Sequence, residues 1–109
     1  LRLRWGGKFL RRIMTDGEQA YVARLAEPDR SIAARFAAKE AALKALTSGL
    51  TGGMRWRDLE VTRDPAGTPS LALHGATAAA FARRGLHVRS LSMSHTDSHA
   101  MAVVLVAMQ

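Results

Sequence analysis

The chain has 109 residues and a formal net charge of +7, with 48% apolar and 23% charged residues. This composition excludes an intrinsically disordered chain, and the length predicts a single domain over residues 1–109. The absence of cysteine excludes disulfides and thiolate metal sites, and no apolar run approaches the ~20 residues that a membrane-spanning helix needs.

The excess of positive charge predicts an anionic partner, which is nucleic acid, a phosphate-rich cofactor or an acidic protein. Nucleic-acid-binding domains gather basic residues on one face beside aromatic side chains. Here the arginines are scattered and aromatic residues make up only 6% of the chain, so a small nucleic-acid binder is a minor alternative. The basic N-terminus has no signal-peptide core, and a cytoplasmic location is therefore expected.

The first half of the chain predicts helices. Residues 1–14 are basic with a roughly helical apolar spacing, and Thr15 with Glu18 fits a capping box that opens a short helix through Leu25. Pro28 breaks that helix. A longer helix follows, capped by Asp29 or Ser31, and it runs to about residue 47.

The second half predicts strands and one more helix. A period of two over residues 55–63, a turn at 64–67 and a strand over 70–74 form a hairpin. An Ala-rich helix over 75–84 precedes strands over 88–94 and 100–108. The last strand is almost continuously apolar, which predicts burial on both faces. The fold class is α+β, with an antiparallel sheet packed against a long helix and shorter helices.

Glu40 and Lys44 lie one turn apart on the predicted long helix. An ion pair between them on a solvated face, worth ~0.2–0.5 kcal/mol, is the commoner explanation of such a pair. The helical wheel, however, places Glu40 beside the apolar stripe, where a carboxylate is useful as a ligand of Mg²⁺. Lys44 would then neutralise charge on a phosphoryl group or relay a proton from an attacking hydroxyl.

His95 closes the predicted strand over residues 88–94. By itself a histidine at a strand end is more often structural. The neighbouring hydroxyls of Ser92, Ser94 and Thr96 are suitable donors to phosphate oxygens. The remaining histidines show no metal-ligand spacing, and we interpret them as structural.

Taken together, these segments resemble the holo-acyl-carrier-protein synthases, the small bacterial type of 4'-phosphopantetheinyl transferase. The resemblance rests on matching segments in the family's order along nearly the whole chain. The most specific are Arg35-Phe36-Ala37-Ala38-Lys39-Glu40-Ala41, Lys44-Ala45-Leu46, Trp56-Arg57-Asp58-Leu59-Glu60-Val61 and Ser92-Met93-Ser94-His95.

The resemblance implies a reaction and its residues. A serine of apo acyl carrier protein attacks the β-phosphate of coenzyme A, Mg²⁺ binds the pyrophosphate, and 3',5'-ADP leaves. Glu40 falls on the family's metal carboxylate and Lys44 on a lysine near the pyrophosphate, which is a candidate proton acceptor. Arg35, His95 and Thr96 fall on positions that contact coenzyme A. This reaction belongs to fatty acid biosynthesis.

The resemblance also implies partners. Members of this type are homotrimers with active sites between subunits, and neither nucleic acid nor a membrane is expected as a partner. The acidic carrier protein would dock on the basic first helix, which carries Arg4, Lys8, Arg11 and Arg12.

The family begins with a strand carrying a G-x-D motif, whose aspartate is a second metal ligand. No aspartate precedes Asp16, so we expect this first strand to be missing from residues 1–109. For this reason an inactive relative, which binds carrier protein or coenzyme A without transfer, is the main alternative to an active transferase.

Overall fold

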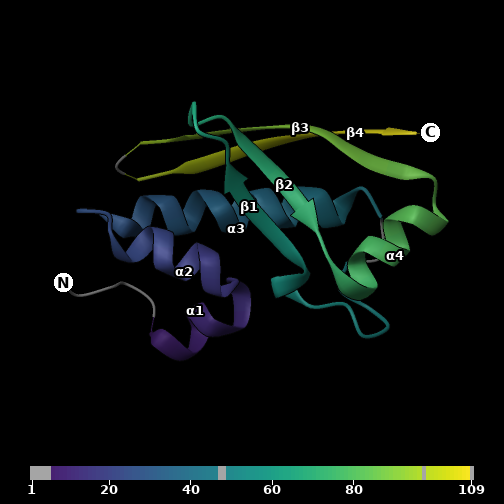
Figure 1. Ribbon diagram of the computed structural model, residues 1–109, viewed down its shortest axis with the longest axis horizontal. Coiled ribbons are helices and arrows are strands. Elements are labelled where there is room, and N and C mark those ends of the chain that lie inside the picture. The colour runs from purple at the N-terminus through teal and green to yellow at the C-terminus, as the bar shows by residue number, and fades with distance from the viewer. Residues whose placement is uncertain (1–5, 47–48, 97, 109) are drawn as a thin grey trace.

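The computed structural model describes residues 6–46, 49–96 and 98–108, and Figure 1 shows the path of the chain. The N-terminal half is helical, and the C-terminal half contains two hairpins with a helix between them. The elements are α1 (Gly7–Ile13), α2 (Asp16–Ala23), α3 (Pro28–Lys44), the 3-10 turn η1 (Trp56–Asp58), β1 (Leu59–Arg63), β2 (Pro69–Leu73), α4 (Gly75–Arg83), β3 (Leu86–His95) and β4 (Ala100–Met108).

Both hairpins are antiparallel. In the first, Leu59 pairs with Leu73 and Arg63 with Pro69. In the second, β3 and β4 pair from Leu86 opposite Met108 to His95 opposite Ala100, with a register shift between Val88 and Ser90. These pairings, together with the helices, confirm the predicted α+β class.

The long helix α3 is the centre of the molecule. In Figure 1 the β3–β4 hairpin runs along one side of it, α1 and α2 lie on the other side, and the β1–β2 hairpin crosses in front. The sheet can approach closely because the helix presents small side chains, Ala38 and Ala42, which are fully buried. Two apolar clusters result: one joins α3 to the strands and α4, and the other joins α3 to α1 and α2.

The helix boundaries differ from the sequence prediction at the start of α3. The structure gives Glu27 as the N-cap residue, without a side-chain hydrogen bond, and Pro28 takes the first helical position. Proline suits that position because the missing N–H would have no partner there. The predicted caps Asp29 and Ser31 are therefore wrong. The helix ends at Lys44, and residues 47–48 lie outside the described part.

Two further expectations differ from the structure. Residues 56–58 form a 3-10 turn and not the start of a strand, because the Asp58 carboxylate accepts the backbone N–H of Arg55 and bends the chain. In β4 one face is exposed: Met101, Val103 and Leu105 are 66%, 61% and 55% exposed. Burial of β4 on both faces is thus wrong for the single chain.

Candidate active site

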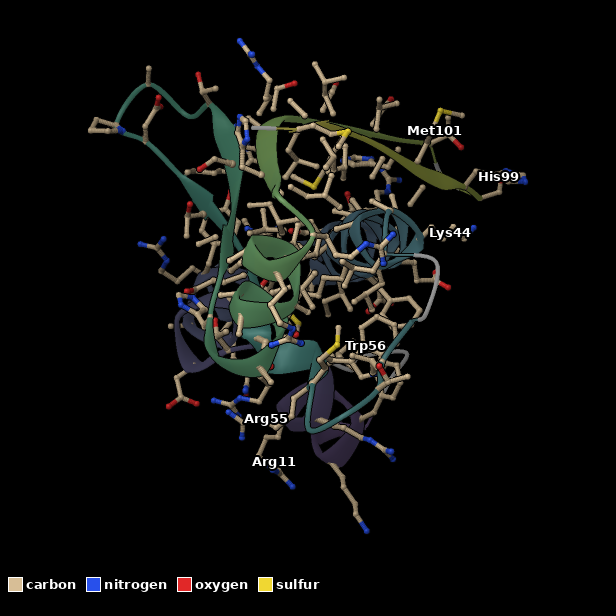
Figure 2. The ribbon with its side chains drawn as sticks, turned by 90° about the vertical axis from the view of Figure 1, so that its right-hand side faces the viewer. Arg11, Lys44, Arg55, Trp56, His99 and Met101 are labelled. Atoms are coloured by element: carbon tan, nitrogen blue, oxygen red, sulfur yellow. The ribbon has the colours of Figure 1, made fainter. Side chains whose placement is uncertain are left out.

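The predicted site residues of α3 lie on two different sides of the helix. Arg35 is buried, whereas Glu40 and Lys44 are exposed. Glu40 lies five positions after Arg35, which corresponds to a rotation of about 140° around a helix axis. In Figure 2, which looks along α3, Lys44 points outward into solvent. Each side of the helix has its own hollow, and these hollows divide the predicted site.

The first hollow has a volume of about 370 Å³ and a basic lining. It lies where the end of β3 meets α2 and the start of α3. Its polar and aromatic lining residues are Tyr21, Glu27, Arg30, Ser31, Arg35, Arg63 and His95, so the cations outnumber the one carboxylate. Several cations around one hollow make it suitable for a phosphate group.

Arg35 is held on several sides within this hollow. Its guanidinium carbon lies 4.5 Å from the centroid of the Tyr21 ring, and its Nη1 donates a hydrogen bond to the Ser31 hydroxyl. Its Nε lies 3.8 Å from a carboxylate oxygen of Glu18. Burial lowers the pKa of Arg35, and the charge of Glu18 opposes that shift. Arginine remains a cation at neutral pH even so.

The second hollow, of about 400 Å³, is mostly apolar. Glu40 is its one charged lining residue, and the others are Phe9, Ile13, Ile32, Ala33, Phe36, Ala37 and Ala100. The prediction that Glu40 borders an apolar stripe is therefore correct in position. The carboxylate itself is exposed, so it needs no partner to offset desolvation. Within the described residues no ion pair joins Glu40 to Lys44.

His95 and Ala100 connect the two hollows. They pair directly at the end of the β3–β4 hairpin, and His95 lines the basic hollow while Ala100 lines the apolar one. The tip of this hairpin therefore borders both hollows across α3. Thr96 lies in the turn, where its hydroxyl accepts the backbone N–H groups of Ser98 and His99 at 3.4 and 3.1 Å. Its hydroxyl hydrogen remains available as a donor.

The described part of the predicted docking surface lies on α1. Lys8, Arg11 and Arg12 are exposed there, and Arg4 lies outside the described residues. Arg11 points into solvent in Figure 2, and its backbone carbonyl accepts a hydrogen bond from Arg57. These side chains form a basic surface that is separate from the basic hollow.

The described residues offer few side chains that could bind a metal ion. Across residues 6–46, 49–96 and 98–108, no three His, Cys, Asp or Glu side chains lie close enough to hold one. Mg²⁺ usually takes one or two carboxylates and completes its shell with phosphate oxygens and water. Glu40 would supply one carboxylate ligand to such an ion.

Sequence reasoning missed the buried charges behind the basic hollow. Lys39 and Glu18 are as buried as Arg35, and the Lys39 ammonium lies 2.7 Å from the Glu18 carboxylate. A helical wheel shows which side chains share a face of α3, but not that Arg35 and Lys39 are buried there. Glu18 was identified only as a capping-box residue, a prediction that the structure confirms. The capping box accounts for only part of the hydrogen bonding of the Glu18 carboxylate.

The chain belongs to the 4'-phosphopantetheinyl transferase superfamily, whose family model matches residues 2–104. A holo-[acyl-carrier-protein] synthase of Solibacter usitatus is 46% identical over 103 residues, which are 94% of this chain and 82% of the relative. These matches confirm the resemblance seen in the sequence and favour a transferase over a nucleic-acid binder.

Solved structures support the same family assignment. The crystal structure of holo-[acyl-carrier-protein] synthase from Neisseria meningitidis has a TM-score of 0.83 at 33% identity, covering 97% of this chain and 84% of that one. The Helicobacter pylori synthase, solved in complex with coenzyme A, has a TM-score of 0.72 at 31% identity, covering 92% and 82%. In the described part of the chain, no helix combines the length and apolar character needed to cross a membrane.

Proposed function

We propose that the chain is a holo-acyl-carrier-protein synthase, which transfers 4'-phosphopantetheine from coenzyme A to a serine of apo acyl carrier protein. The observation that carries this proposal is the 46% identity to a named synthase over 94% of the chain. A complex of a similar structure with coenzyme A supports the choice of donor. The reaction supplies holo carrier protein for fatty acid biosynthesis in the cytoplasm.

The proposed chemistry is a phosphoryl transfer. The serine oxygen forms a bond to the β-phosphorus, the bond from that phosphorus to the departing phosphate oxygen breaks, and 3',5'-ADP leaves while the serine proton passes to a base. Glu40 would hold the magnesium ion, which when bound neutralises charge on the pyrophosphate. Lys44, one turn further along α3, adds a second positive charge there or accepts the proton.

Arg35, His95 and Thr96 bind phosphate groups of coenzyme A in this proposal. Arg35 and His95 line the same hollow, so a single anionic group can contact both. Arg35 is fixed by Tyr21 and Ser31, which lowers the entropy lost when it binds a ligand. The Thr96 hydroxyl is oriented by the hairpin turn.

We also propose a homotrimer whose active sites lie between subunits. Two features support it: Arg35 and Glu40 lie in separate hollows, and the outer face of β4 exposes three large apolar side chains. A neighbouring copy that covered β4 would bury this face. In the proposed trimer, the basic hollow of one chain would meet the apolar hollow beside Glu40 of another. The acidic carrier protein would dock on α1 through Lys8, Arg11 and Arg12, together with Arg4.

Intact-mass analysis tests the proposal. The chain is mixed with Mg²⁺, coenzyme A and apo acyl carrier protein, and the carrier should gain the mass of one phosphopantetheine group on its serine. Glu40→Gln should lower the rate by about 10²–10³-fold while the far-UV spectrum is unchanged, because the metal carboxylate is lost. Asp16→Asn is the matched control, since Asp16 is an exposed carboxylate on α2 that is 93% exposed. The absence of any mass gain with the wild-type chain would contradict the proposed function.

A further inference from the structure

Glu18 is a buried carboxylate that connects three elements. It lies on α2, and its side chain is completely inaccessible to solvent. One oxygen accepts the backbone N–H of Thr15 at 3.0 Å and the Lys39 ammonium at 2.7 Å. The other accepts the backbone N–H of Val61 at 3.0 Å and faces Arg35 at 3.8 Å. A residue that only capped α2 would need just the first of these contacts.

Glu18 lies at the centre of a buried group of charges. Its carboxylate faces two cations, Arg35 and Lys39, and all three side chains are buried, while the charge of Glu60 also acts on Lys39. Burial lowers the pKa of both cations, and the charge of Glu18 acts against that shift in each case. Without Glu18, two like charges would remain together in the interior, and such an arrangement is costly. Glu18 therefore offsets the charge of the Arg35 guanidinium, which Tyr21 and Ser31 also contact.

Arg35 and Lys39 differ in what else they contact. Arg35 lines the basic hollow beside His95, whereas Lys39 donates to the backbone carbonyl of Ile13, beneath α1. Arg35 and Lys39 lie one turn apart on α3 and therefore share a face of the helix. Glu18 contacts this face, which is opposite Lys44. Only the contact with Arg35 leads to the candidate coenzyme A site.

We propose that Glu18 is a positioning residue for coenzyme A binding, which acts by holding the Arg35 guanidinium at the wall of the basic hollow. The alternative is a purely structural role in the packing of α2, α3 and β1. The inference rests on the proposed function, because it presupposes that the hollow binds a phosphate group of coenzyme A. The two roles predict different effects on the Michaelis constants.

The test uses the full chain and four variants: Glu18→Gln, Arg35→Lys, their combination, and Lys39→Met. Calorimetry measures the affinity for coenzyme A, and steady-state kinetics measure KM for coenzyme A and for carrier protein separately. Glu18→Gln should raise the Kd and KM for coenzyme A about tenfold or more and leave KM for carrier protein unchanged. The double variant should be no worse than Arg35→Lys alone, since both changes affect the same guanidinium.

Lys39→Met is the matched control, because it removes the other cation of Glu18 without changing the wall of the hollow. It should lower stability but leave the Kd for coenzyme A unchanged. If Glu18→Gln does not fold, the double variant Glu18→Gln with Lys39→Met takes its place in the binding measurement. The added change removes one of the two cations that the loss of Glu18 leaves unpaired. An unchanged Kd, or additive effects of Glu18→Gln and Arg35→Lys, would overturn the inference. A wild-type chain that neither binds coenzyme A nor transfers would instead contradict the proposed function.

Discussion

Glu60 shows how single residues connect the buried charges to the surface. Its carboxylate accepts the Thr15 hydroxyl at 2.8 Å and the His74 ring at 3.0 Å. Burial alone would raise the pKa of Glu60, but these hydrogen bonds and the charges of His74 and Lys39 outweigh it and hold the pKa below its ordinary value. Because Thr15 also caps α2 beside Glu18, Glu60 extends the polar network toward solvent.

The lowered pKa of Glu60 predicts a pH dependence of stability. A depressed carboxyl pKa stabilises the fold above the unfolded value of 4.5, and this contribution is lost as the pH falls through the folded pKa. His74→Ala removes one hydrogen bond, so the loss of unfolding free energy between pH 6 and pH 3 should shrink by about 0.5 kcal/mol. Urea unfolding at both values measures it. Glu60→Gln should reduce the loss at least as much, and an equal loss in all three proteins would contradict this assignment.

Glu40, Lys44 and His95 are candidate site residues because their order and spacing match the family's segments, and their roles remain a prediction. The burial of Arg35 could not be read from a helical wheel, since it depends on Glu18, which is far away in the sequence and reaches α3 only in the folded chain. A period of 3.6 shows which residues share a face, but not which buried charge will find a partner.

At the scale of elements, α4 begins at a sharp turn that is fixed by Asp58. The Asp58 carboxylate accepts the Thr77 hydroxyl at 3.1 Å, and its backbone carbonyl accepts the N–H of His74 at 2.7 Å. Between them Gly75 has a φ of +55°, a conformation that residues with a side chain adopt at a cost. The approach of Asp58 to Gly75 makes this glycine different from the one that ends α4.

Gly75→Ala and Gly85→Ala form a matched pair that separates the two effects. Both glycines have a positive φ, so both substitutions should cost about 1–2 kcal/mol of unfolding free energy. A Cβ at Gly75 would also lie 3.0 Å from an Asp58 carboxylate oxygen, whereas at Gly85 it would meet nothing within 4 Å. Chemical denaturation should therefore show the larger loss for Gly75→Ala. Equal losses would mean that Asp58 moves aside without cost.

Most elements could be predicted from local sequence, including the bounds of β4 and the helix that ends before Gly85. The exceptions are informative. Residues 56–58 alternate like a strand, yet the Asp58 carboxylate turns the chain there. The apolar run of β4 reads as a strand buried on both faces, but a single chain covers only one of them. A run of apolar residues indicates that a strand is buried, but not whether its own chain or another molecule covers it.

The exposed face of β4 predicts the behaviour of the whole molecule. Large apolar side chains that are more than half exposed along one strand mark an interaction surface. The wild-type chain should therefore self-associate, and the proposed homotrimer predicts that sedimentation shows three copies. Val103→Glu with Leu105→Glu should dissociate it, because the substitutions place charges in the apolar contact. Transfer activity should be lost with the trimer, since Arg35 and Glu40 would no longer share a site.

The matched control for this change is Ala79→Glu with Ala82→Glu on α4, where both residues are exposed. It adds the same charge without touching β4, and the trimer and its activity should persist. A wild-type chain that sediments as a monomer and still transfers would contradict the shared site. A dissociated variant that keeps full activity would contradict it as well.

The unbroken course of α3 has a consequence for the kinetics of binding. Glu40 and Lys44 occupy one 17-residue helix without a glycine or an internal proline, so their relative positions are set when the chain folds. Organising these two groups therefore requires no hinge or loop closure, and the entropy of arranging them is lost during folding and not during ligand capture. The association rate should accordingly be limited by diffusion and assembly, without a slow closing step of this helix.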